Sequence, residues 1–417
     1  MQVQISKTPV FISLSIGLLF YGLFSTLTSV VILHLKEIFG LSYSISSLIH
    51  LTFFSTYIIA SIPASRIVRV WGYKLSLIIG YFTTGLGCMM FYFGINTASY
   101  PLLMTSLFVM AVGSTMLLVV CNLYIVLLGD YKRAAARLSF LHSFYALGCL
   151  LAPLYGSEWI KELWGITADM DMNTYIKSLS LYIGTPFIIM SNLMYFLTVI
   201  FVFLNMPEFE TQLLKPWNKF EERHKKIHVM HFKQLRLGAF AVFAYIGTEV
   251  ALSEYLVTYF SDFTYLYWTG YVVGLLIGST LLIYISPRKM LLSFTIGASL
   301  LLLFAIFTTG LVSFTAVAAI GFFNSILFPT IWSLSVKGLG RFSEQGAAIM
   351  VMAHVGGGII PFNVVNFSAA GTGSNKMAFL ILILCYAYII FYAIKGSTFV
   401  RNDDFEQSTL RAMKPSK

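Results

Sequence analysis

Two glutamates, Glu249 and Glu254, stand inside the apolar stretch 237–260, which reads LGAFAVFAYIGTEVALSEYLVTYF. At about 1.5 Å per residue, a helix of this length crosses the roughly 30 Å hydrocarbon core of a bilayer. An ionised carboxylate near mid-depth is costly unless it is paired, hydrated or protonated, so such residues usually face a substrate or ion path. The stretch therefore predicts a membrane helix with a functional carboxylate at Glu249.

Proton coupling is the chemistry that such a carboxylate favours. It requires a group that is protonated in one access state and ionised in the other, and loss of water favours the neutral form of a carboxyl group. Glu249 is the first candidate for this role and Glu254 is another. The two side chains project about 140° apart on an ideal helix, so we do not expect them to share one proton as a dyad. The alternative for Glu249 is a fixed, hydrogen-bonded strut between helices.

Polar and aromatic side chains elsewhere supply the groups that a hydroxylated solute needs, namely donors, acceptors and an aromatic face. The residues expected to bind it are Ser29, Asn122, His142, Tyr145, Glu249, Trp268, Asn324 and His354. His142 is also a candidate for proton coupling, because histidine titrates near physiological pH. The alternative is a buried histidine bonded to a neighbour. Ser29 ends a polar stripe that includes Tyr21 and Ser25, which suits either helix packing or cavity lining.

The chain that carries these residues is too apolar for a water-soluble globule of its size. Of its 417 residues, 58% are hydrophobic and only 11% are charged. We therefore predict an all-α membrane protein with twelve transmembrane helices. The expected spans are 9–34, 45–65, 75–95, 101–128, 137–156, 178–204, 237–260, 263–285, 289–308, 311–336, 345–369 and 376–395.

Lysines and arginines set the expected orientation. With the amino terminus inside, 23 of the 27 fall on the cytoplasmic side, and a bias of this size is lost if one span is added or missed. We expect a multi-pass protein of the cytoplasmic (inner) membrane, with both termini cytoplasmic and no removed signal peptide. The net charge of +10 is then an orientation signal, and we expect the lipid bilayer as a partner and no nucleic acid.

Several other classes of site are disfavoured by residue spacing. The four cysteines lie inside expected spans without paired spacing, which favours core packing over disulfide bonds. His224, His228 and His231 fall in a lysine-rich connector without cysteine, so we expect no metal site there. The sequence has no zincin histidine pair, nucleophile elbow or phosphate loop. We expect no cofactor, no catalytic residue and no enzymatic activity, and a monomer.

The two halves of the chain correspond to each other. A glycine and a proline recur with the same spacing in spans 137–156 and 345–369, offset by 208 residues. Helix-weakening segments in matching places indicate an internal repeat whose flexible elements flank a central site. The residues expected to act as hinges or gates are Gly148, Pro153, Gly356, Gly357, Gly358 and Pro361.

This repeat predicts two six-helix bundles related by a pseudo-two-fold axis. The amino-terminal bundle is expected at 1–204 and the carboxy-terminal bundle at 237–396. A cytoplasmic connector is expected at 205–236 and a cytoplasmic tail at 397–417.

Several segments together resemble the fucose permease and glucose/galactose transporter family of the major facilitator superfamily. They include HLKEIFGLSYSISSLI (34–49), NLYIVLLG (122–129), RLSFLHSFYALGCLLAPLYG (137–156), GTEVALSEYLVTYF (247–260), YWTGYVVG (267–274), FFNSILFPTIWSL (322–334) and HVGGGIIPF (354–362). The resemblance touches nearly every span in order. It implies an alternating-access cavity between two bundles and, for much of that family, proton-coupled sugar symport. The basic turn at 63–74 also resembles the superfamily's loop between spans 2 and 3, although the Asp usual in that motif is missing. We expect Arg66, Arg69 and Lys74 to gate or orient rather than bind substrate.

The departures from this family fall on its amino-terminal sugar and proton positions. Thr28 and Ser29 stand where the family typically has Asn-Asp, and Leu118 stands where an acid or amide is expected. His142 and Tyr145 replace a Gln and an Asn. Two transport functions therefore stay open: proton-coupled movement of a small, sugar-like solute, and an uncoupled facilitator or an importer or exporter of a different, non-sugar solute. A receptor on the same fold is disfavoured, because the connector is too short for a signalling domain.

Overall fold

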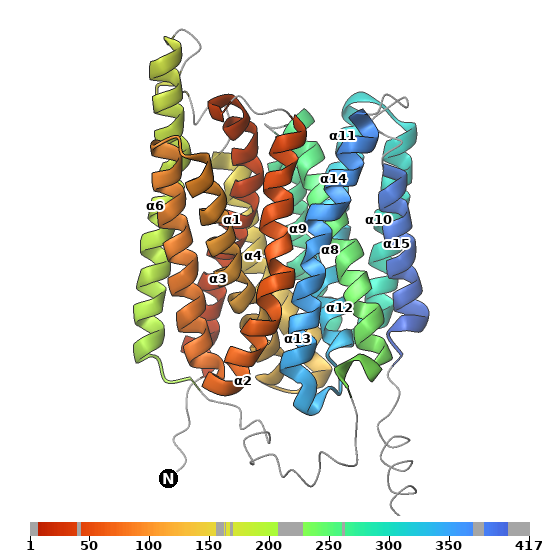
Figure 1. Cartoon of the computed structure of the whole chain (residues 1–417). Coiled ribbons are helices and arrows are strands. Elements are labelled where there is room, and N and C mark those ends of the chain that lie inside the picture. The colour runs from red at the N-terminus through yellow and green to blue at the C-terminus, as the bar shows by residue number, and fades with distance from the viewer. Residues whose placement is uncertain are drawn as a thin grey trace, which may run out of the picture.

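The structure, a computed structural model, describes residues 7–39, 43–155, 162, 164–166, 170–206, 228–260, 263–369 and 379–398. Within these ranges the long elements are α-helices that run side by side along one direction (Figure 1). Such helices satisfy their own backbone hydrogen bonds, which is the condition for crossing hydrocarbon. The predicted all-α class is confirmed.

The first half of the chain provides six membrane-length segments in five elements. They are α1 (Lys7–Phe39), α2 (Tyr43–Asn96), α3 (Tyr100–Leu127), α4 (Ala134–Tyr155), which follows the short helix η1 (Tyr131–Arg133), and α6 (Met172–Phe203). α2 holds two of the predicted spans, because the backbone leaves helical geometry at Gly72, where φ is 80°. A left-handed φ of this kind is strained for residues that carry a Cβ, so glycine lets the chain turn there.

The second half repeats this number of segments with two interruptions. Its elements are η2 (Val229–His231), α8 (Lys233–Tyr259), α9 (Tyr265–Tyr284), α10 (Pro287–Phe307), α11 (Gly310–Asn324), α12 (Leu327–Ser335), η4 (Gly340–Phe342), α13 (Ser343–Met352), η5 (Ala353–Val355), α14 (Gly356–Ala369), α15 (Phe379–Phe391) and η6 (Tyr392–Gly396). The predicted span 311–336 is divided into α11 and α12, and η5 divides the predicted span 345–369. Asn324 and His354 lie at these breaks.

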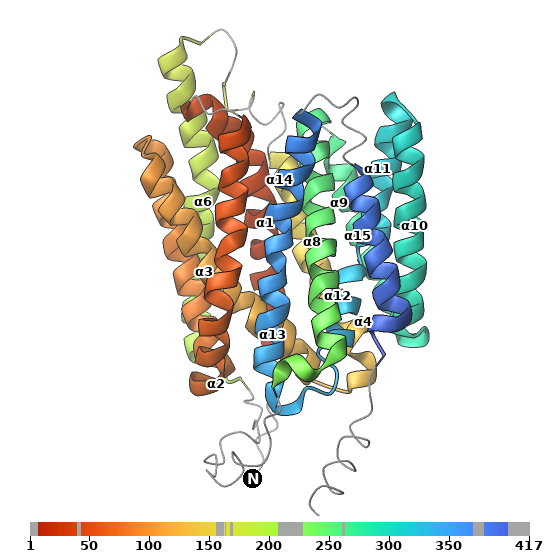
Figure 2. The same cartoon turned by 45° about the vertical axis from the view of Figure 1, so that its right-hand side comes forward.

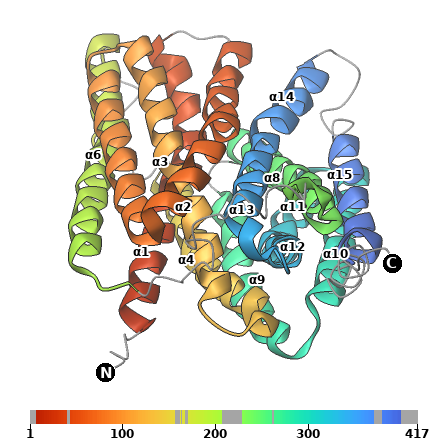
Figure 3. The same cartoon turned by 60° about the horizontal axis from the view of Figure 1, so that its bottom comes forward.

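Eleven helical segments of the described residues are long and apolar enough to cross a membrane. One of them contains both arms of α2, so the described part of the chain accounts for the twelve predicted spans. Along the boundary between the halves, which we call the seam, α2 and α4 adjoin α13, α12 and α9 (Figure 3).

Two of the glycines singled out in the sequence bring helix backbones together. A Cβ at Gly148 in α4 would overlap the carbonyl oxygen of Leu19 in α1. In the second half, a Cβ at Gly356 would overlap the carbonyl oxygen of Phe243 in α8. Small residues allow this close approach between membrane helices, where packing rather than the hydrophobic effect drives association.

The other expected hinge residues are also buried. Gly357 and Gly358 face Phe54 of α2 across the seam. Pro153 lies inside α4 and Pro361 inside α14. Gly148 and Gly356 thus lie at close helix contacts, and Pro153 and Pro361 are buried inside helices.

Candidate functional site

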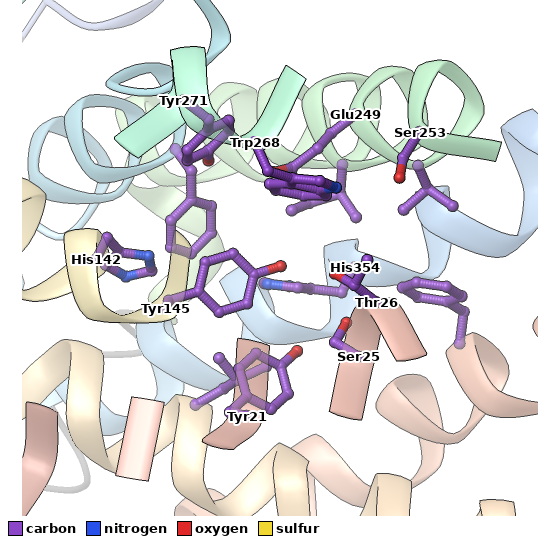
Figure 4. A pocket seen from close by; sticks show the side chains of 15 residues that line it. Tyr21, Ser25, Thr26, His142, Tyr145, Glu249, Ser253, Trp268, Tyr271 and His354 are labelled. Atoms are coloured by element: carbon purple, nitrogen blue, oxygen red, sulfur yellow. The ribbon is translucent and has the colours of Figure 1, made fainter. Parts of the chain in front are cut away.

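A central cavity lies across the seam, and the labelled side chains of both halves point into it (Figure 4). About 660 Å³ of space there is free of protein atoms. The first half contributes Tyr21, Ser25, Thr26, Phe54, Leu118, His142 and Tyr145, and the second half contributes Ile246, Glu249, Val250, Ser253, Trp268, Tyr271, Phe328 and His354. A cavity shared in this way is reshaped by any movement of one half against the other.

Glu249 is the only carboxylate among the described residues that line this cavity. Its side chain is only 5% exposed, and its Oε1 has no hydrogen-bond partner. Tyr245, one turn earlier on α8, and Tyr271 of α9 lie beside the carboxylate, and their hydroxyl oxygens are 2.7 Å apart. That bond uses one of the two hydroxyl hydrogens, which leaves the other for the carboxylate. No lysine or arginine is found among the described lining residues.

Trp268 presents an unused donor to the same cavity. Its indole is 3% exposed, and Nε1 has no acceptor. Its ring lies 5.4 Å from that of Tyr271, so the two form an aromatic wall on α9. On the opposite wall, the rings of Tyr21 and Tyr145 stack at 5.5 Å. Buried polar atoms without partners are uncommon, and each needs an explanation.

His142 is held by Asn122 at the edge of the cavity. The ring Nε2 lies 2.9 Å from Asn122 Oδ1, an acceptor, so Nε2 donates. The neutral ring then keeps Nδ1 as an acceptor. Asn122 itself is fully buried behind His142 and is not a lining residue, and its Nδ2 has no partner within the described structure.

His354 reaches the cavity from η5, where the break between α13 and α14 exposes backbone carbonyls. Its Nδ1 lies 3.2 Å from the carbonyl oxygen of Met350 and 3.1 Å from that of Val351. Because both partners are acceptors, Nδ1 carries the proton, and Nε2 of the neutral ring is an acceptor. Its ring also lies 5.5 Å from that of Tyr57 across the seam.

The remaining predicted site residues lie elsewhere. Asn324 is fully buried in a network in which its Nδ2 donates to Tyr267 at 3.0 Å and its Oδ1 accepts from Tyr386 at 2.8 Å. Glu254 is half-buried and is not among the residues that line the cavity. The side chain of Ser29 lies outside the described residues.

Contacts between the halves close one end of the cavity. We call this the connector end, because α6 ends and α8 begins on this side of the molecule (Figure 1). Tyr73 of α2 donates to Oε1 of the buried Glu344 of α13 at 3.3 Å. The Tyr131 hydroxyl donates to the carbonyl oxygen of Ser333, and the Lys337 ammonium lies 5.8 Å from the Tyr131 ring centroid. A solute in the cavity could not leave through this end without breaking these contacts.

Sequence reasoning missed several lining residues. Tyr271 and Phe328 belong to helices for which the sequence does not show which face is turned toward the cavity. Tyr245, which lies beside Glu249 without lining the cavity, could have been predicted, because it precedes Glu249 by four residues and therefore shares its helix face.

Comparison with known proteins shows which family this chain belongs to. Residues 14–361 match the model of the major facilitator superfamily. The chain belongs to the major facilitator superfamily. Within it, the chain is 34% identical over 398 residues to a glucose/galactose transporter of Brucella abortus, covering 92% of this chain and 93% of that protein. It is 25% identical over 389 residues to an L-fucose-proton symporter of Escherichia coli, covering 88% and 89%.

Solved structures share the fold of this chain. A transporter of this superfamily, FucP, in the outward conformation, superimposes with a TM-score of 0.76 at 25% identity, covering 94% of this chain and 99% of that one. A proton:xylose symporter, XylE, superimposes with a TM-score of 0.68 at 15% identity, covering 93% and 95%. The resemblance to the fucose and glucose/galactose transporter family seen in the sequence is confirmed, and the protein is a transporter of this superfamily, not an enzyme.

Proposed function

We propose that this protein moves a small, sugar-like solute across the cytoplasmic membrane by alternating access, coupled to protons. The observation that carries the proposal is Glu249: a buried carboxylate in a cavity shared by both halves, with no cation among the described lining residues. In such a place the ionised form is unfavourable, so the group is expected to hold a proton while water is excluded. Opening of the cavity to water on the other side would release it.

The unused atoms around the cavity fit a solute with several hydroxyl groups. Trp268 offers a donor, while Glu249 and His354 offer acceptors. A hydroxyl group can donate and accept, so one solute could satisfy all three, and the stacked tyrosines provide a face for its C–H groups. The named relatives, a glucose/galactose transporter and an L-fucose-proton symporter, are consistent with this class.

Alternating access would use the two halves as units. We infer that 1–204 and 237–396 are the two bundles, that 205–236 and the tail 397–417 are cytoplasmic, and that the connector end faces the cytoplasm. The asymmetry of lysine and arginine supports this orientation. In that orientation the structure is closed toward the cytoplasm.

The test is solute and proton flux measured together in proteoliposomes, with glucose, galactose and L-fucose as solutes. We expect Glu249→Gln to abolish accumulation driven by a pH gradient while solute exchange continues, because the amide keeps the shape but cannot release a proton. Glu254→Gln is the matched control on the same helix and should retain accumulation. Undiminished pH-driven accumulation by Glu249→Gln would refute the coupling role, and solute flux without proton flux in the native protein would favour the uncoupled facilitator.

A further inference from the structure

A second cavity opens on the lateral surface at the seam, and we call it the seam groove. It holds about 1870 Å³ of space free of protein atoms, more than the central cavity. One wall is the first arm of α2, from the first half, and the other is formed by η2, α8, α13 and η5 of the second half. Figure 2 shows α13 between α2 and α8 on the face toward the viewer. The groove therefore faces the surroundings of the helices rather than the solute path.

Each wall changes from apolar to basic in the same direction. On α2, Ile58 and Ile62 are followed on the same helix face by Arg66 and then Arg69. The step from Ile58 to Arg66 is eight residues, which is about 12 Å along a helix. α8 runs the opposite way, and Arg236 lies in its first turn, at the connector end.

The next turns of α8 show the same change from basic to apolar side chains. Phe240 and Phe243 follow Arg236 on the groove-facing side. The two walls therefore place guanidinium groups at one level and apolar side chains at the next, although they come from different halves of the chain.

The apolar part of the groove is open. Phe240 is 65% exposed, Ile62 is 47% exposed and Ile58 is 43% exposed. The basic end carries three arginines and His228, with Val229 and Met230 beside His228, and the described lining residues include no aspartate or glutamate. Arg69 also interacts electrostatically with the buried Glu344 behind the wall, whereas Arg66 and Arg236 are exposed.

This distribution matches one kind of ligand. A guanidinium group binds phosphate through paired N–H donors, and basic residues at the membrane boundary attract anionic lipid headgroups. Acyl chains need an apolar surface directly below the phosphate. We propose that an anionic phospholipid occupies the seam groove, with its phosphate at the arginines and its acyl chains along the exposed isoleucines and Phe240.

A lipid in the seam groove would affect the transport cycle. The walls of the groove belong to both halves, and they adjoin where the contact between Tyr73 and Glu344 closes the connector end. A ligand that binds both walls stabilises the arrangement in which they are close. The bound lipid therefore favours the state that is closed at this end.

The test uses the purified, delipidated full chain in detergent, with phosphatidylglycerol and phosphatidylcholine of identical acyl chains. We expect phosphatidylglycerol to raise the Tm more than phosphatidylcholine. The double variant Arg66→Gln/Arg236→Gln should bind phosphatidylglycerol roughly 30-fold more weakly. Each basic residue near an anionic lipid contributes about 1 kcal/mol of binding free energy, and the variant removes two. The matched control is Arg133→Gln/Lys289→Gln, which removes two exposed cations of other helix ends and should keep the shift.

Three results would overturn the proposal. They are equal shifts with both lipids, a phosphatidylglycerol shift that survives in the groove variant, and an equal shift with soluble glycerol 1-phosphate, which would show an anion site without lipid. If the double variant does not fold, native mass spectrometry of the unaltered protein and of Arg66→Gln alone replaces it. More retained phosphatidylglycerol than phosphatidylcholine on the unaltered protein, reduced by Arg66→Gln, supports the groove, and equal retention refutes it.

Discussion

At the scale of single residues, a variant of Trp268 can test whether its indole N–H group donates a hydrogen bond to the solute in the central cavity. Trp268→Phe keeps an aromatic ring but removes the N–H group. Loss of one hydrogen bond to the solute contributes about 1 kcal/mol, so we expect a roughly 5-fold rise in KM for transport. The control is Trp71→Phe, at an exposed tryptophan outside the cavity. An unchanged KM would show that the indole nitrogen does not contact the solute.

His142 depends on Asn122 for its orientation, and this gives a second prediction. Asn122→Leu removes the acceptor 2.9 Å from His142 Nε2 and frees the ring to rotate. We expect solute affinity and the pH profile of transport to change together, and His142→Gln to show the same change. Asn192→Leu, at a polar residue on the outside of α6, is the control. A normal pH profile in Asn122→Leu would show that His142 acts only in packing.

At the residue level, the structure shows where the candidate site residues lie, while their roles stay predictions. Glu249, His142, Tyr145, Trp268 and His354 all line one cavity. Periodicity within a helix gives the relative direction of its residues, but it does not give the rotation of one helix against the next. For this reason the sequence did not reveal the Tyr245–Tyr271 pair or the placement of Asn122 behind His142.

Helix contacts provide a prediction at the scale of elements. Gly148→Ala and Gly356→Ala each place a methyl group against a backbone carbonyl oxygen that cannot move aside. Overpacking of this kind costs about 1–3 kcal/mol, so we expect a lower Tm for each variant. Gly270→Ala is the comparison variant. It gains the same helix propensity, and its added Cβ would lie 3.3 Å from the backbone nitrogen of Phe322, which is a tight contact but not an overlap. Equal Tm values for the three variants would show that these contacts have room to adjust.

At this scale the number and order of helices could be predicted from the sequence, because each apolar run matches the thickness of a bilayer. It did not give the breaks in spans 311–336 and 345–369. Glycine and proline near these positions weaken a helix, but whether it separates into two depends on the neighbours that satisfy the freed backbone groups. In this chain the Nδ1–H group of His354 donates to the carbonyl oxygens of Met350 and Val351 at such a break.

At the scale of the whole molecule, the proposed alternating access requires a balance between states closed at opposite ends, and we expect Tyr73 to act on that balance. Its hydroxyl joins α2 to Glu344 of α13, so the contact exists only while the connector end is closed. Tyr73→Phe keeps the ring and removes this bond, which leaves a buried carboxylate with less stabilisation. We therefore expect the population to shift toward the state open at the connector end, by roughly 5-fold for a bond of about 1 kcal/mol.

This shift can be measured with a cysteine at Ser25, a lining residue of the central cavity, and a membrane-impermeant maleimide. In inside-out vesicles, labelling of Ser25→Cys should be faster when Tyr73→Phe is present, and in right-side-out vesicles it should be slower. Tyr92→Phe, near the carboxyl end of α2, is the matched control and should leave both rates unchanged. Faster labelling from both sides would instead indicate a general loosening of the seam, because an equilibrium between two closed ends can favour access from only one side at a time.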